Sequence, residues 1–241
     1  MKTAPECLPC LLNRVLETAS RAASDPWLQK KMLMEIVSAV ADGDIDFERT
    51  PAEILSDGIV RACDLLHADP FAEERLRLNE SMLAHLTELQ NLLGRQPDPL
   101  VAAGRLAVIC NDLAVLKAPL DPAALVADAV SRRLAVDDFV RLKEALASAK
   151  RVIYVLDNAG EVVADRLMIE AIGPQRVTAV VRRRPLMRDA LDADAAMAGI
   201  TCRVVNAGCD AAGIPPSLIP AEFRRELDRA DVIVGKGEAS Y

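Results

Sequence analysis

The hydrophobic pattern of the chain changes once, close to residue 150. From Asp25 to about Ala149, apolar residues recur at spacings of three and four, which is typical of amphipathic helices. Thr50 and Glu53 also have the spacing of a capping box. The pattern predicts a helical N-terminal region over residues 1–149. Five helix starts are marked by a capping residue followed by a first-turn proline: Asp25-Pro26, Thr50-Pro51, Asp69-Pro70, Asp98-Pro99 and Asp121-Pro122.

Short runs rich in β-branched residues alternate with helical segments after residue 150. The predicted strands are residues 151–157, 176–183, 200–205 and 231–236. Segments 161–172 and 221–230 between them have helical spacing. Strands that alternate with helices predict a parallel, doubly wound sheet. We therefore expect an α/β fold in which the helical region packs on a Rossmann-like, mainly parallel sheet over residues 150–241.

Composition narrows the class of protein. With 241 residues and 51% hydrophobic residues, the chain can form one or two domains with a sizeable core. Its net charge is -7 and aromatic residues make up 3%, so no basic, aromatic-rich surface is expected, which argues against nucleic acid and anionic membranes as partners. Pro5, Glu6 and Asn13 interrupt the start of the chain, where a signal peptide needs an apolar core. We expect a cytoplasmic protein.

Six cysteines are spread along the chain, which favours thiols over disulfides. Cys7 and Cys10 form a C-x-x-C motif, but the sequence has no second such pair and two histidines, so the motif is half of a zinc site. Two interpretations stay open for it. The cysteines are small residues on a first helical turn, or they have a metal or redox role in a zinc-linked interaction protein.

Polar residues follow several predicted strands. Asp157 and Asn158 end the first strand, Asp189 comes after the second, and Lys236 stands between two glycines after the fourth. Ligands of parallel sheets bind outside the carboxyl ends of the strands, so we expect these side chains at one edge. Helix capping would explain Asp157 or Asn158 alone, but not the pair followed by a glycine and Glu161.

These residue types indicate phosphate chemistry. Carboxylate and amide oxygens suit magnesium or manganese, and a lysine between glycines suits a phosphate. Metal-assisted hydrolysis follows, in which the cation polarises the phosphoryl group and activates a water while Lys236 neutralises charge. An aspartyl-phosphate on Asp157 is less favoured, because Ala159 stands where a second aspartate is expected. Ordinary roles remain for each residue: Asp189 as an N-cap, Asp192 and Asp194 on a solvated helix face, Lys236 as a surface charge, and residues 182–184 as a solvated strand end.

Five motifs, in order, resemble the metal-dependent damage-control phosphatases, a family first described as a domain of unknown function. The similarity covers nearly the whole chain, and the early C-x-x-C is similar to the archaeal and bacterial type of the family. The motifs are ECLPC at 6–10, DNAGE at 157–161, PLMRDALDAD at 185–194, NAGCD at 206–210 with Gly213, and DVIVGKG at 231–237.

The resemblance implies a helical region on a Rossmann-like domain that hydrolyses small phosphorylated metabolites, such as sugar phosphates or related damaged metabolites. A divalent cation (manganese, nickel, cobalt or magnesium) would be held by Asp157, Asn158 and Asp189. Asp157, Asn158 and Lys236 would be the catalytic residues. Lys236, Gly160, Glu161 and Asn111 are implied at the phosphate and substrate.

Three positions depart from the family pattern. Arg188 replaces an asparagine before Asp189, Ala114 replaces an acidic residue after Asn111, and Ser240 replaces an asparagine in the last motif. Family members continue past the position of Tyr241, so we expect C-terminal truncation. An alternative is a catalytically degenerate module that binds a phosphometabolite or nucleotide and retains the metal site. Binding of a dinucleotide is disfavoured, because DNAGE lacks the G-x-G-x-x-G glycines.

Overall fold

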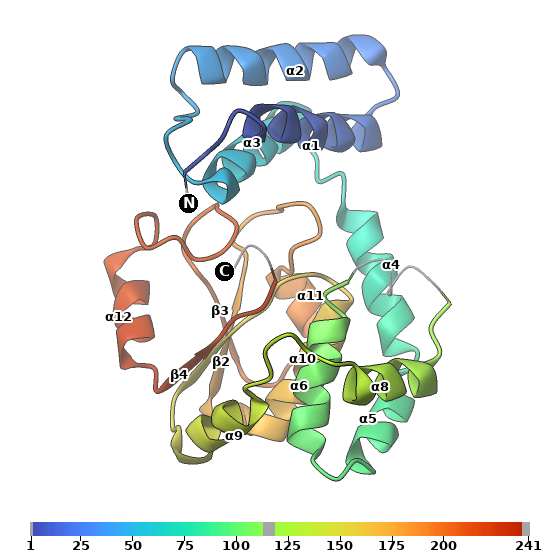
Figure 1. Cartoon of the computed structure of the whole chain (residues 1–241). Coiled ribbons are helices and arrows are strands. Elements are labelled where there is room, and N and C mark those ends of the chain that lie inside the picture. The colour runs from blue at the N-terminus through green and yellow to red at the C-terminus, as the bar shows by residue number, and fades with distance from the viewer. Residues whose placement is uncertain (1, 113–118, 238–241) are drawn as a thin grey trace.

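Four strands form one parallel sheet in the computed structural model, which describes residues 2–112 and 119–237. The strands are β1 (Val152–Val155), β2 (Val177–Val181), β3 (Arg203–Asn206) and β4 (Val232–Val234). Their order is β3-β2-β1-β4, and all three neighbouring pairs are parallel. The sheet crosses the centre of Figure 1 with helices on both sides. The predicted α/β fold with a parallel sheet is confirmed.

Helices and the loops between them make up the rest of the described chain. Four of the five predicted starts are confirmed, because Asp25, Thr50, Asp98 and Asp121 each accept a hydrogen bond from a backbone N–H of the helix that follows. The helices are α1 (Cys7–Ala22), α2 (Pro26–Ala41), α3 (Pro51–Leu66), α4 (Ala72–Leu83), α5 (Leu86–Gly94), α6 (Pro99–Ile109), α8 (Pro122–Ser131), α9 (Phe139–Ser148), α10 (Glu161–Ile172), α11 (Asp192–Met197) and α12 (Ala221–Arg229).

The fifth predicted start, at Asp69-Pro70, is wrong by two residues. Helix α4 begins at Ala72, and Asp69 lies in the turn before it. The Asp69 carboxylate accepts the backbone N–H of Phe71 at 3.2 Å and pairs with the guanidinium of Arg75. Arg75, in the first turn of α4 itself, therefore binds the carboxylate that local spacing assigned to the helix start.

The capping box at the start of α3 gives a first prediction. Thr50 Oγ1 accepts the Glu53 N–H at 3.4 Å, and Glu53 Oε2 accepts the Thr50 N–H at 3.0 Å. Thr50→Ala removes one acceptor, so we expect the free energy of unfolding to fall by about 1 kcal/mol in urea titrations. Ser131→Ala removes an exposed hydroxyl at a helix end and serves as the control, with an expected change below about 0.5 kcal/mol. Equal losses in both variants would contradict the capping assignment.

Helices α1, α2 and α3 form a layer with its own hydrophobic core, which we call the helical layer. Leu11, Met32 and Ile36 are at most 1% exposed and pack with Ile54 in this core. Figure 1 shows the layer above the carboxyl ends of the strands. The helical layer therefore forms one wall of any site at that edge of the sheet.

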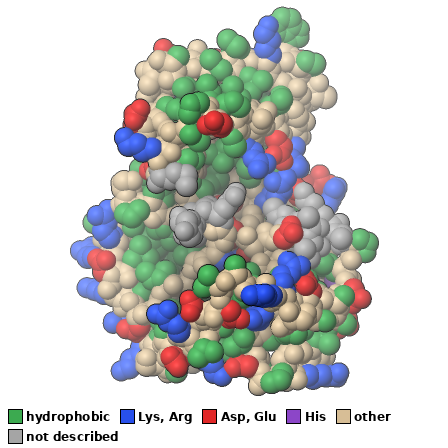
Figure 2. Space-filling view, in the orientation of Figure 1, with side chains coloured by type: hydrophobic (Ala, Val, Ile, Leu, Met, Phe, Trp, Pro, Cys, Tyr) green, Lys and Arg blue, Asp and Glu red, His purple; other side chains and the backbone are tan. Residues whose placement is uncertain are grey.

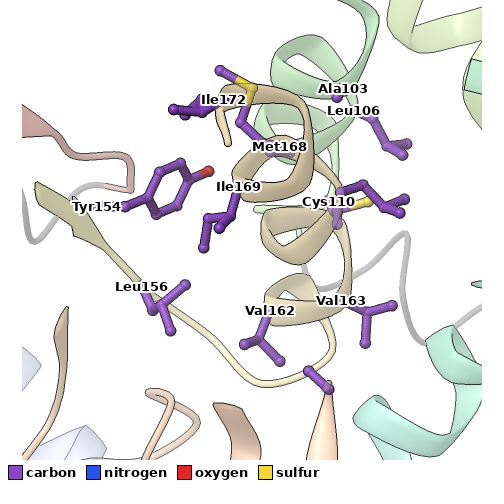
Figure 3. Close-up of a cluster of buried hydrophobic side chains, with 14 of the residues drawn as sticks. Ala103, Leu106, Cys110, Tyr154, Leu156, Val162, Val163, Met168, Ile169 and Ile172 are labelled. Atoms are coloured by element: carbon purple, nitrogen blue, oxygen red, sulfur yellow. The ribbon is translucent and has the colours of Figure 1, made fainter. Parts of the chain in front are cut away.

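A second core joins the remaining N-terminal helices to the sheet. Leu106 of α6, Leu146 of α9, Val152 of β1 and Val163 of α10 belong to one buried cluster. Figure 3 shows α6 and α10 side by side, with Cys110 against α10. This core crosses residue 149, so the change from helices to strands there does not separate two cores.

The opposite face of the sheet is covered by α12. Phe223 of α12 packs with Ile153, Val155 and Val180 from β1 and β2 in a third cluster. Helices thus lie on both faces, as expected for a doubly wound sheet. Within residues 2–112 and 119–237, no helix has the length and apolar character needed to cross a membrane.

Candidate active site

Two segments run side by side at the carboxyl end of β1. The Asp157 carbonyl accepts the Ala190 N–H at 2.7 Å, and the Ala159 N–H donates to the Arg188 carbonyl at 2.9 Å. An antiparallel bridge joins Asn158 to Asp189. Asp189 lies eight residues beyond the end of β2, and it reaches Asn158 because the loop after β2 folds back against the loop after β1.

The three predicted metal ligands line one cavity. Asp157, Asn158 and Asp189 lie on the wall of a cavity of about 340 Å³, together with Asn111 from the end of α6. The helical layer contributes the facing wall, and Figure 2 shows the surface hollowed between that layer and the α/β body. Its cavity residues are Arg14 of α1 with Leu55, Ser56 and Ile59 of α3.

Two amides connect the carboxylates of Asp157 and Glu161. Asn111 Nδ2 donates to Asp157 Oδ2 at 2.7 Å and to Glu161 Oε2 at 3.0 Å. Asn158 Nδ2 donates to the same two oxygens at 3.0 and 3.2 Å. Asp157 is 6% exposed and Glu161 is fully buried. The predicted site residues Asn111, Asn158 and Glu161 are therefore in direct contact.

Asp189 is held by a buried arginine. Arg182 is 4% exposed, and its Nε donates to Asp189 Oδ2 at 2.7 Å. Burial raises the pKa of Asp189 to about 6, the Arg182 cation opposes that rise and the Asp157 carboxylate adds to it. Arg182 is thus not part of a solvated strand end. Asp189 is not an N-cap either, since α11 begins at Asp192.

Lys236 lies beside the cavity rather than on its described wall. Its side chain is 9% exposed, and its Nζ pairs with Glu161 and lies 3.0 Å from Asp165 Oδ2. Burial lowers the pKa of Lys236 to about 7, and the Asp157 carboxylate opposes that change. Gly237 has φ +83°, and a Cβ at that position would overlap the Asp157 carboxylate. Contact between Lys236 and a phosphate stays a prediction.

Asn79 of α4 supports the turn before α10. The sequence patterns did not predict this role. Asn79 Oδ1 accepts the Gly160 N–H at 2.6 Å, and its Nδ2 donates to Asp194 Oδ1 at 2.7 Å. Gly160 has φ +79°, a conformation that favours glycine. Asp194 is 6% exposed, so it does not lie on a solvated helix face. One pattern in the sequence could have indicated this role: Arg75 and Asn79 are polar and stand one helical turn apart, on the face of α4 that is buried.

Arg188, the first departure from the family pattern, has its charge compensated. Its guanidinium lies 2.9 Å from a Glu17 oxygen and 3.0 Å from a Glu74 oxygen, and 5.2 Å from the Phe71 ring centroid. The side chain therefore connects the cavity wall to α1 and α4. The other two departures, Ala114 and Ser240, lie outside the described residues.

The two cysteines of the C-x-x-C motif lie on the first turn of α1. Cys10 is exposed and Cys7 is half-buried, both are thiols, and neither lines the cavity. In the part of the chain that the structure describes, no three or more His, Cys, Asp or Glu side chains gather to hold a metal ion. A metal or redox role for Cys7 and Cys10 stays a prediction.

Comparison with known proteins assigns the family. A family model described as the damage-control phosphatase ARMT1-like domain matches residues 3–241. The chain belongs to the damage-control phosphatase family. This membership confirms the resemblance found in the motifs and supports a phosphatase that acts on damaged metabolites.

Individual members of the damage-control phosphatase family agree with this assignment over the full chain. A damage-control phosphatase of Archaeoglobus fulgidus is 31% identical, with 100% of this chain and 86% of that protein covered. A damage-control phosphatase of Pyrococcus horikoshii is 26% identical, with 100% and 85% covered. The crystal structure of a DUF89 family protein from Pyrococcus horikoshii matches with a TM-score of 0.86 at 25% identity, covering 100% of this chain and 86% of that one.

Proposed function

We propose that this chain is a metal-dependent phosphatase that hydrolyses small phosphorylated metabolites, such as sugar phosphates or related damaged metabolites. The observation that carries the proposal is the shared cavity of about 340 Å³, whose wall includes Asp157, Asn158 and Asp189. A cavity of this size at the carboxyl edge of a parallel sheet suits a small ligand. Family membership supports the phosphatase chemistry.

The chemistry of the wall fits a divalent cation. Two carboxylates and one amide offer the hard oxygen ligands that magnesium and manganese prefer. Asp157 is 6% exposed and makes no ion pair with any described residue; its Oδ2 accepts hydrogen bonds from two amides. A buried carboxylate that makes no ion pair is costly, and a bound metal ion would stabilise it. We therefore assign manganese, nickel, cobalt or magnesium to Asp157, Asn158 and Asp189.

The side chains around the cavity have separate tasks in this proposal. A bound cation supplies Lewis-acid polarisation of the phosphoryl oxygen and activation of a water. Asn111 fixes the orientation of the Asp157 carboxylate, and Arg182 does the same for Asp189. Arg14 places a cation on the opposite wall, where an anionic substrate enters. Lys236 neutralises charge on the oxygens of the transferred group.

The test is phosphate release from a panel of sugar phosphates and an aryl phosphate. Protein stripped with a chelator is expected to release no phosphate, because Asp157 and Asp189 then hold no cation. Adding manganese, nickel, cobalt or magnesium is expected to restore turnover. A rate in chelator equal to the rate with metal would contradict metal dependence.

A phosphometabolite-binding module that retains the metal site is the second candidate. The observation in its favour is the position of Lys236, which pairs with Glu161 and Asp165 instead of lining the cavity. This candidate predicts that a cation and inorganic phosphate bind while no ester of the panel is hydrolysed. Calorimetric binding measured beside the turnover assay separates the two functions.

A further inference from the structure

A buried tyrosine and a buried aspartate stand behind Lys236, and the proposed reaction does not use them. Tyr154 in β1 is 1% exposed and Asp165 in α10 is 0% exposed. The Tyr154 hydroxyl donates to Asp165 Oδ1 at 2.8 Å, and Asp165 Oδ2 lies 3.0 Å from Lys236 Nζ. A polar chain therefore runs from the interior of the sheet to the lysine.

The same chain continues from Lys236 into the cavity wall. Glu161 and Asp165 are one helical turn apart on α10, and both contact the Lys236 ammonium. The Glu161 carboxylate accepts hydrogen bonds from Asn111, which also donates to Asp157. The position of the ammonium is thus set by two buried carboxylates, one of which is connected to the predicted metal ligand.

Packing alone does not explain these two polar side chains. Figure 3 shows the Tyr154 ring beside α10, near Leu156 and Ile169. A phenylalanine would fill the same space, and a buried hydroxyl or carboxyl is costly unless it is hydrogen-bonded. Val162 and Leu167, also on α10, are buried and apolar. Asp165 is therefore a polar residue on a largely apolar helix face, and its contacts with the Tyr154 hydroxyl and Lys236 account for it.

The hydrogen bond from Tyr154 also affects the pKa of Asp165. Burial raises the pKa of Tyr154 well above its usual value, so the phenol keeps its proton and stays a donor at neutral pH. Burial raises the pKa of Asp165 well above its usual value, the hydrogen bond from Tyr154 opposes that rise, and the Asp157 carboxylate adds to it. Tyr154 thus opposes the protonation that burial favours, and its hydrogen bond fixes the orientation of the Asp165 carboxyl group beside Lys236.

We propose that Asp165 and Tyr154 are positioning residues for Lys236. Asp165 holds the ammonium beside the cavity, and Tyr154 orients the Asp165 carboxylate. This inference rests on the proposed function, in which Lys236 contacts the phosphate of the substrate. Both residues act through Lys236, so their effect on activity must disappear when the lysine is absent.

A double-mutant cycle tests this dependence. Tyr154→Phe is expected to lower kcat/KM by about 10-fold, as is usual when an outer partner of a site residue is removed, with Asp165→Asn lowering it at least as much. In the Lys236→Gln background, Tyr154→Phe is expected to cause no further loss. Equal fold losses with and without Lys236 would overturn the proposal, because a purely structural effect is independent of the lysine.

Thr18→Val is the matched control. Thr18 is fully buried in α1 and its hydroxyl donates to the Arg14 carbonyl at 2.8 Å, so the variant removes a hydrogen bond of the same length outside the Lys236 network. We expect stability to fall while kcat/KM stays within twofold of the unaltered protein. If Tyr154→Phe likewise lowers stability and leaves kcat/KM within twofold, the positioning role is overturned.

Inorganic phosphate gives a readout that does not require turnover. Calorimetry with and without manganese measures its affinity in the unaltered protein, in Tyr154→Phe, in Lys236→Gln and in the double variant. Weaker phosphate binding in Tyr154→Phe, with no further weakening in the double variant, supports the positioning role even if no ester is hydrolysed. Phosphate binding of this kind without hydrolysis of any ester would overturn only the proposed function. Protein that neither hydrolyses esters nor binds phosphate would overturn both.

Discussion

Asp157→Asn is expected to abolish metal-dependent phosphate release while leaving the metal-free protein folded. Loss of an outer partner of a metal ligand costs about 10-fold to 100-fold, so loss of the ligand charge itself should lower manganese affinity by at least about 100-fold. The free energy of unfolding in chelator is expected to change by about 1 kcal/mol or less, because the variant removes a buried charge that pairs with no described cation. Calorimetry, phosphate release and urea unfolding measure the three quantities.

Asp192→Asn is the control for this variant. Asp192 is exposed on the first turn of α11, three residues after Asp189, so its substitution removes the same charge without touching the cavity. Turnover and manganese affinity should stay within twofold of the unaltered protein. Unchanged activity in Asp157→Asn would show that the metal is held elsewhere.

Arg182→Met is expected to lower the free energy of unfolding by about 3 kcal/mol, measured in chelator at pH 8. Breaking a buried ion pair by removing one partner costs about 3–5 kcal/mol, and the low end applies because the Asp189 side chain remains 16% exposed. Arg182 also donates to the Gly213 carbonyl at 2.7 Å, so that acceptor loses its partner as well. Adding Asp189→Asn to the variant should recover part of the loss.

The loss in Arg182→Met should depend on pH. The Arg182 cation lowers the pKa of Asp189, so the variant raises that pKa further above the value of about 6. A carboxyl with a raised folded-state pKa binds more protons when folded, so stability falls as pH rises from the unfolded pKa, about 3.9, to the folded one. The deficit should therefore be smaller at pH 5 than at pH 8. A deficit that is the same at both values would contradict an electrostatic role.

The sequence predicts the four strands, with each carboxyl end within two residues of its observed position, and most helix starts, because both depend on neighbours in the chain. The run before Asp157 is continuous and β-branched, and Thr50 caps a helix whose first residue follows it directly. Asp69 shows the limit of this reasoning. Its carboxylate pairs with Arg75, and local spacing does not reveal that such a contact competes with a helix cap.

The sequence predicts the metal ligands, but it does not predict the residues that hydrogen-bond to them and to the turn beside them. Asp157, Asn158 and Asp189 stand at strand ends and in motifs, and the structure places them on one cavity wall. Asn79 bonds to Gly160 across 81 positions of the chain. In the sequence, Arg182 belongs to a run of three arginines that is typical of a solvated strand end, and its partner Asp189 is seven residues away. Contacts of this kind depend on tertiary packing, which periodicity does not encode.

The helical layer has a consequence for how such phosphatases diversify. Its residues pack in their own hydrophobic core, whereas the predicted metal ligands Asp157, Asn158 and Asp189 lie on the α/β body. Leu55, Ser56 and Ile59 of α3 face the cavity from the layer. Substitutions there can reshape the pocket while the geometry at the end of β1 stays intact. New substrate preferences can therefore arise on the layer, and the chemistry of phosphate transfer can be inherited unchanged.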